Sequence, residues 1–169
     1  MQVSVRGARD HTLTQLLKLA AKSFGKNLFS PRMLETITIK IRIHDTLDAG
    51  GYCDYEVDDE TLTPRTFIID ILRTRRKINM FKVLAHEMVH AKQTAKGEMK
   101  DRIVKSKYVT LWFGEKYTED VSYWDHPWEL EAYGLEHSLV AKFLIEHDQF
   151  KNLRQKHEDW FAKEESSEE

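Results

Sequence analysis

The segment His86-Glu87-Met88-Val89-His90 holds the clearest chemistry in this sequence, because its two histidines stand four residues apart. The pattern from about residue 75 to 96 is helical, so the two imidazoles lie one turn apart on one face and can converge on a metal ion. Glu87 lies beside the first histidine, where a carboxylate could take a proton from metal-bound water and pass it to a leaving group. Zinc suits such a site because it accepts nitrogen and oxygen ligands and keeps a position open for water. The sequence therefore predicts His86 and His90 as zinc ligands and Glu87 as the catalytic base.

The helix that carries these residues is expected to be buried on most sides. Val83 and Val89 flank the histidines, and further apolar side chains lie nearly opposite them on the helix. These apolar residues are Met80, Phe81, Leu84, Met88, Ala91 and Ala95. A helix displayed to water would have one apolar stripe and an otherwise polar surface. The pattern therefore favours the floor of a cleft as the place of the two histidines.

A catalytic zinc site needs a third protein ligand. The continuation HExxHxxGxxH is absent, since Gln93 and Lys96 occupy the positions of its glycine and third histidine. The ligand must therefore come from elsewhere, and the best segment is WDHPWELEAY, residues 124–133. Its candidate ligands are Glu129, Glu131 and His126.

Helical spacing distinguishes these candidates. Pro127 is expected to open a helix that runs to about residue 147, since proline is favoured at the first helical position. Glu129 shares a partly apolar flank with Glu136 beside the core face, whereas Glu131 lies on a flank that looks solvated. We therefore expect Glu129 to be the third ligand, and Glu131 and His126 stay open as alternatives.

HEMVH on one helix, followed by Glu129 in an ExxA pattern on a later helix, resembles the gluzincin branch of the zincin metallopeptidases. Residues 66–144 are similar to small stand-alone zincin-like domains of bacteria and bacteriophages, near the ImmA/IrrE and SprT-like groups. The resemblance implies zinc-dependent hydrolysis of a protein or peptide substrate. It also implies that a strand above the active-site helix, here residues 66–72, holds an extended peptide by main-chain pairing.

The chain departs from the gluzincin pattern at Tyr133 and from the SprT-like pattern at Glu129. Many gluzincins carry Asp or Asn four residues after the ligand glutamate, where this chain has Tyr133. The SprT-like group uses a third histidine in place of the glutamate, which keeps His126 open as a ligand. The resemblance therefore implies a reaction class and no particular substrate.

The remaining elements predict an α+β, zincin-like fold. Apolar spacing predicts a helix over residues 12–24 that ends at Gly25, and Ser30-Pro31 is expected to open a short helical turn. Alternation predicts strands over 37–43, 52–57 and 66–72. Three strands in succession suggest a small, mostly antiparallel sheet, formed as a meander. We expect this sheet to pack on the HExxH helix and on the second ligand-bearing helix.

An aromatic-rich stretch lies between the two ligand helices. Residues 108–113 and 116–118 are expected to pair as a hairpin around Gly114-Glu115. Tyr117 or Tyr123 could line the cleft and help to stabilise an oxyanion. The simpler account is that these rings pack the hairpin onto the core.

Composition limits the classes of function. The 169 residues are 41% hydrophobic and 32% charged, as expected of a globular protein, and we expect one domain over residues 1–160. The acidic end, residues 161–169, is expected to be disordered. The net charge of -2 and a single basic cluster at 73–77 give no clear nucleic-acid site. No stretch approaches the roughly 20 apolar residues of a membrane span.

The single cysteine, Cys53, excludes an intrachain disulfide and fits a reducing compartment. We expect a cytoplasmic protein, in the host cytoplasm if the chain is encoded by a phage. Two competing hypotheses are a metal-retaining binding or regulatory module without turnover and a SprT-like protease that acts on DNA-bound protein. The intact Glu87 argues against the first, and the lack of a basic tail or zinc-ribbon cysteines argues against the second.

Overall fold

The computed structural model describes residues 1–58, 61–104, 107–118 and 120–147, so the end of the expected domain and the acidic segment 161–169 lie outside the described residues. The elements in chain order are β1 (Gln2–Arg6), α1 (His11–Leu28), α2 (Pro31–Thr36), β2 (Thr38–His44), β3 (Gly51–Asp58), β4 (Thr61–Leu72), α3 (Lys77–Lys96), β5 (Met99–Val104), β6 (Lys107–Trp112), β7 (Glu115–Tyr117), the 3-10 helix η1 (Tyr123–Asp125) and α4 (Pro127–Glu146). Helices and small sheets are mixed in this order, which confirms the predicted α+β class.

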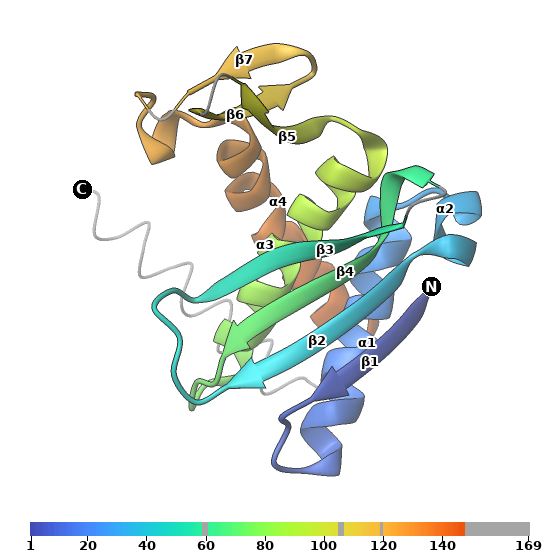
Figure 1. The fold of residues 1–169 in the computed structure, drawn as a ribbon. Helices are drawn as coiled ribbons and strands as arrows, with labels where there is room; N and C mark the ends of the chain where they lie inside the picture. The colour runs from blue at the N-terminus through green and yellow to red at the C-terminus, as the bar shows by residue number, and fades with distance from the viewer. Residues whose placement is uncertain (59–60, 105–106, 119, 148–169) are drawn as a thin grey trace.

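A four-stranded sheet in the order β1-β2-β4-β3 forms one layer of the fold, with the helices on one of its two faces (Figure 1). Strand β2 pairs in parallel with both β1 and β4, and only β3 and β4 are antiparallel. The predicted antiparallel meander is therefore wrong. Strand β4 carries Phe67, Ile69 and Ile71, all fully buried, and it takes an interior position, whereas the more polar β3 lies at the edge.

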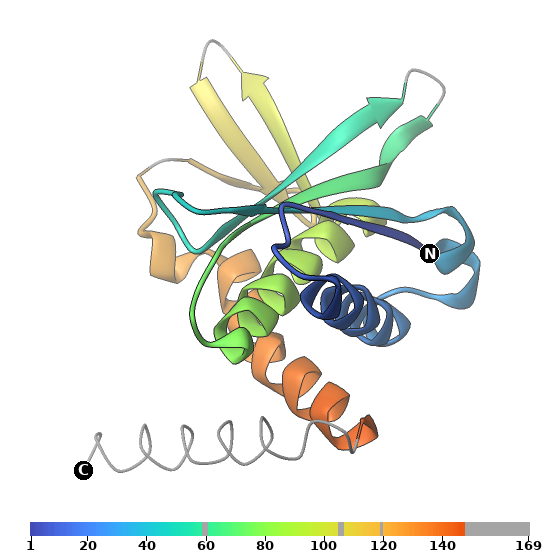
Figure 2. The ribbon, with the colours of Figure 1, turned by 90° about the horizontal axis from the view of Figure 1, so that it is seen from below.

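The two faces of this sheet differ in character. On one face Arg42 forms a bidentate ion pair with Asp70, at 2.8 and 2.7 Å, and Lys40 pairs with Glu56. The other face buries the isoleucines of β2 together with Phe67, Ile69 and Ile71 of β4. Figure 2 shows α1 and α3 on that side of the sheet, with α4 packed on the far side of the two helices. The hydrophobic core thus lies in two layers around α3, which holds this helix firmly in place.

Helix ends follow local chemistry, with one exception. Ser30 caps α2 by accepting a bond from the Met33 amide, and Gly97, with φ of +72°, ends α3 at the residue after the helical pattern predicted to residue 96. The prediction that Gly25 ends the first helix is wrong, because α1 continues to Leu28. A Cβ at Gly25 would lie 2.6 Å from Cε of Met1, so close packing explains this glycine.

A second sheet, β5-β6-β7, is antiparallel throughout and lies beyond the C-terminal end of α3 (Figure 1). The predicted hairpin is confirmed, and its turn uses positive φ at Phe113 and Gly114. Strands β1 and β5 were not predicted, because both are short and at least half of the residues in each are polar or charged. No helix in the described part of the chain combines the length and apolar character that crossing a bilayer requires.

Candidate metal centre

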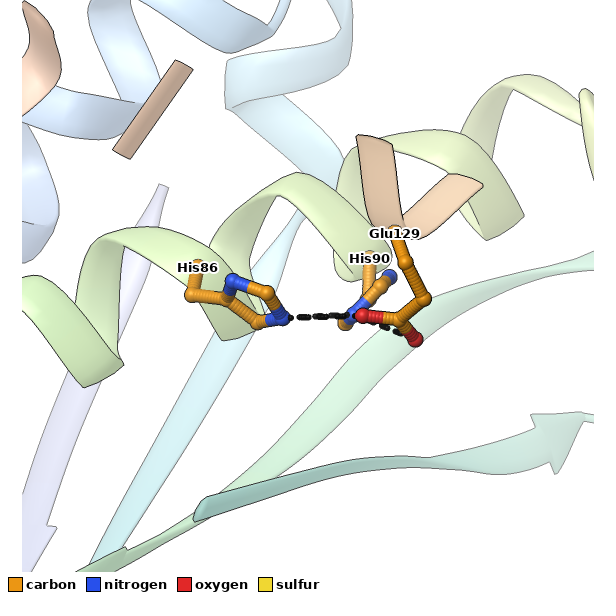
Figure 3. Close-up of side chains that lie close together, drawn as sticks. All are labelled: His86, His90 and Glu129. Atoms are coloured by element: carbon orange, nitrogen blue, oxygen red, sulfur yellow. Dashed lines mark hydrogen bonds and ion pairs between the residues drawn. The ribbon is translucent and has the colours of Figure 1, made fainter. Parts of the chain in front are cut away.

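Two helices bring the three predicted ligands together. His86 and His90 lie one turn apart on α3, and their Nε2 atoms are 3.2 Å apart. Glu129, in the first turn of α4, places Oε2 3.3 Å from Nε2 of His86 and Oε1 3.5 Å from Nε2 of His90. Figure 3 shows the three side chains pointing toward one another from these two helices. They are the one group of three or more potential ligands that the described residues bring this close.

These separations fit a zinc ion. Zinc binds nitrogen and oxygen at about 2.0–2.1 Å with tetrahedral geometry, so neighbouring ligand atoms are expected about 3.3 Å apart. The two Nε2 atoms here are 3.2 Å apart, and one carboxylate oxygen of Glu129 lies near each of them, Oε2 at 3.3 Å from His86 and Oε1 at 3.5 Å from His90. Two imidazole nitrogens and one carboxylate oxygen also form a donor set that zinc accepts. The residues present can therefore hold this metal with little rearrangement.

The two alternative ligands point elsewhere. Glu131 accepts bonds from Lys92 at 2.7 Å and from Gln93 at 2.9 Å. His126 immediately precedes α4, and its ring stacks on Trp128 with 4.4 Å between the ring centroids. Neither residue joins the group of potential ligands, whereas Glu129, which the helical flank favoured, does.

A buried polar side chain accepts a hydrogen bond from the Nδ1 atom of each histidine. The Nδ1 atom of His86 donates to Oε2 of Glu136 at 3.0 Å, and Nδ1 of His90 donates to Oε1 of Gln93 at 2.8 Å. With Nδ1 engaged in this way, Nε2 of each ring is directed to the shared site. Sequence reasoning missed both supports, although Glu136 lies two turns after Glu129 on the same flank.

Gln93 also connects the two ligand helices. Its side chain is fully buried, and its Nε2 donates to the carbonyl oxygen of Trp128 and to Glu131, both at 2.9 Å. Lys92 extends the connection, because it pairs with both Glu131 and Glu98. These bonds fix the start of α4 against α3, and thereby the position of Glu129.

Hydrogen bonds set the charge state of the ligands. Burial alone would lower the pKa of His86, but its bonds to Glu129 and Glu136 raise it to about 9. The same contacts hold the pKa of Glu129 well below its usual range, although burial opposes this. The phenol of Tyr123 also donates to Oε2 of Glu129, at 2.6 Å. A cation is therefore favoured at this position, whether a proton or a metal ion.

Glu87 lies in the same cleft as the ligands and is only 7% exposed. Burial raises the pKa of its carboxyl, although His90 and His86 oppose the rise. Strand β3 passes so close that a Cβ on Gly51 would lie 3.0 Å from Oε1 of Glu87 and 2.5 Å from Cγ1 of Val83. A glycine is therefore needed where the sheet edge meets this carboxylate.

The cleft has a volume of about 570 Å³ and is bordered by β3, the two ligand helices and the second sheet. Gly51, Tyr52 and Cys53 of β3 line it. The expectation that residues 66–72 would run along the cleft as a free strand is wrong, because every residue of that segment pairs with β2 and the segment pairs with β3 on its other side. The strand with an open edge beside the cleft is β3.

Burial and the carboxylate of Glu87 raise the pKa of the Cys53 thiol, which argues against a nucleophilic role for this residue. The chemistry of the cleft therefore rests on the histidines and carboxylates. Comparison with family models, with curated proteins and with solved structures finds no match to this chain, so the site alone carries the argument for function.

Proposed function

We propose that this chain is a zinc-dependent metallohydrolase, a zincin-like peptidase in which His86, His90 and Glu129 hold the metal. The observation that carries the proposal is the convergence of His86, His90 and Glu129, whose ligand atoms lie within 4.8 Å of one another in a cleft that also contains the buried Glu87. A structural zinc site is usually closed by four protein ligands, whereas a catalytic site has three and an open position. Three ligands beside a cleft favour the catalytic kind.

The chain's own residues would act on protons and on the carbonyl group. Zinc, when bound, supplies Lewis acidity that makes water a better nucleophile and polarises a carbonyl. Glu87 accepts the proton of the attacking water and delivers it to the amine that leaves. Burial keeps the pKa of this carboxyl raised, which favours both halves of that transfer. The Tyr123 hydroxyl donates to Oε2 of Glu129, and a turn of this phenol into the cleft that it lines would offer its proton to the oxygen that becomes negatively charged.

The shape of the cleft supports a peptide as substrate. Strand β3 has one unpaired edge, and its first three residues line the cleft beside the metal centre. An extended peptide can add to such an edge through main-chain hydrogen bonds. This arrangement transfers to β3 the role that sequence resemblance assigned to residues 66–72.

Metal content and turnover test the proposal together. Protein purified without chelators is expected to hold about one zinc ion per chain by atomic emission, and His86→Ala is expected to lose it. Glu87→Gln should retain zinc but abolish cleavage of a quenched fluorescent peptide library. The matched control is Glu115→Gln, the same kind of change at an exposed carboxylate of β7 outside the cleft, which should retain zinc and activity.

Three results would overturn parts of the proposal. A wild-type protein that takes up no zinc, even after dialysis against it, would refute the metal centre. If Glu87→Gln cleaved peptides at the wild-type rate, Glu87 would have no role as the base. If the zinc-loaded wild type bound peptides and cleaved none, the chain would be a metal-retaining binding module.

A further inference from the structure

The cleft carries one negative charge that the proposed metal centre does not balance. Its acidic lining residues, among those the structure describes, are Glu87, Glu129 and Asp101, and its lining includes no lysine or arginine. The two positive charges of a zinc ion offset Glu87 and Glu129. The Asp101 carboxylate is left without a compensating charge inside the cleft.

Asp101 is held in position by neutral hydrogen-bond donors. The hydroxyl of Thr110 donates to its Oδ1 atom at 2.8 Å across the β5–β6 pair. The phenol of Tyr108 also donates a hydrogen bond to Asp101. Burial and this neighbouring carboxylate raise the pKa of Tyr108 to about 12. Among the described residues no lysine or arginine forms an ion pair with Asp101, although Arg102 borders a neighbouring pocket together with Asp101 and Tyr108. The carboxylate is thus fixed in place without a cationic partner in the described part of the chain.

Aromatic rings line the same cleft as this carboxylate. Tyr52 from β3 and Tyr108 from β6 both line the cleft, and they are 45% and 52% exposed. The face of an aromatic ring attracts an ammonium or guanidinium group. Met99 lines the same cleft and offers an apolar surface for the methylene groups of a long side chain. A carboxylate, two exposed phenol rings and a thioether together match a lysine or arginine side chain.

We propose that Asp101 selects substrates that carry a lysine or arginine within a few residues of the scissile bond, with the cationic group paired to Asp101 beside Tyr52 and Tyr108. The inference rests on the proposed function, because the cleft is taken to bind a peptide across the metal centre. Asp101 acts here as a specificity residue and takes no part in bond cleavage.

Peptide binding by zinc-loaded Glu87→Gln tests this inference separately from turnover. The probes are fluorescein-labelled peptides that carry lysine, norleucine or glutamate at one position, which is moved along an otherwise neutral sequence. Fluorescence anisotropy is expected to show, at one position, binding about fivefold tighter for lysine than for norleucine, the upper range for a solvent-accessible ion pair. Glutamate at that position should bind more weakly than norleucine.

Asp101→Asn, made in the same background, keeps an acceptor for Thr110 and should make lysine and norleucine peptides equal. Asp101→Lys should reverse the preference, so that glutamate binds best. The matched control is Glu115→Gln, which removes an exposed carboxylate from the same small sheet outside the cleft and should leave the lysine preference unchanged. Zinc content and the thermal unfolding midpoint of each variant confirm that the fold is retained.

Equal binding of the lysine, norleucine and glutamate peptides would overturn the inference, as would a complete lack of peptide binding. A uniform loss of binding in Asp101→Asn, without a change in charge preference, would also overturn it by assigning Asp101 a structural role. If lysine peptides bound best but wild-type protein cleaved none of them, the inference would stand and the proposed peptidase activity would fail.

Discussion

The affinity of the metal centre for zinc is expected to rise steeply with pH above neutrality, because the metal must displace a proton from His86. The bonds from this imidazole to Glu129 and Glu136 raise its pKa to about 9, and zinc binds only the neutral ring. Protons therefore weaken the apparent affinity by about 100-fold at pH 7 and by about twofold at pH 9. The expected gain between these two values is about 50-fold, whereas a histidine of ordinary pKa would give about 1.3-fold.

The gain in zinc affinity is measured at intervals of half a pH unit by competition with a fluorescent zinc chelator of known pH dependence. Calorimetry at pH 7 in buffers of different ionisation enthalpy should also report the release of about one proton per zinc. Glu136→Gln is the informative variant, because it removes one carboxylate that raises the pKa of His86. Its affinity should rise less between pH 7 and pH 9.

Equal zinc affinity at pH 7 and pH 9 would refute the reasoning, since it would mean that no proton is displaced from His86 in this range. The metal-free protein should show the opposite trend in stability. A raised pKa in the folded state stabilises the fold fully below the unfolded pKa of about 6.5, and this contribution is lost as the pH rises through about 9.

Three further substitutions test the surroundings of the site. Gln93→Leu removes the acceptor that orients His90, so zinc affinity should fall about 10- to 100-fold in the same chelator assay, and an unchanged affinity would contradict that role. Tyr123→Phe removes the hydroxyl beside Glu129 and should lower kcat by about 10- to 100-fold on a cleaved peptide at unchanged zinc content; full retention of kcat would leave this ring as a cleft wall only. Phe81→Ala empties a fully buried position and should lower the free energy of unfolding by about 3–5 kcal/mol in urea titrations, while a loss below about 1 kcal/mol would contradict its packing.

Features governed by local geometry could be predicted from the sequence. The spacing of His86 and His90 depends only on the helical repeat, and the glycine after α3 marks its end through a left-handed conformation. Glu129 could be preferred over Glu131 because the apolar residues of α4 already define its inner flank. Each of these features involves residues within one or two turns of a single helix.

Features that depend on how distant elements meet could not be predicted. Strands β3 and β4 both alternate, and only the greater apolar content of β4 indicates that it lies inside the sheet. The roles of Gln93 and Glu136 appear only when α3 and α4 are placed against each other. The same holds for Asp101, whose strand is mostly charged and shows no apolar face in the sequence.

The ligands of the proposed ion come from two helices, and the whole of the second sheet lies between them along the chain. An ion that joined His90 to Glu129 would cross-link a loop of about 40 residues. If this cross-link restricts the unfolded chain as a covalent bridge does, it would stabilise the folded state by roughly 4 kcal/mol. Release of the ion would remove this tether while the sheet-and-helix core keeps its own packing. We therefore expect the first effect of metal release to be faster amide hydrogen exchange in β5, β6 and β7, the strands that contribute none of the ligands.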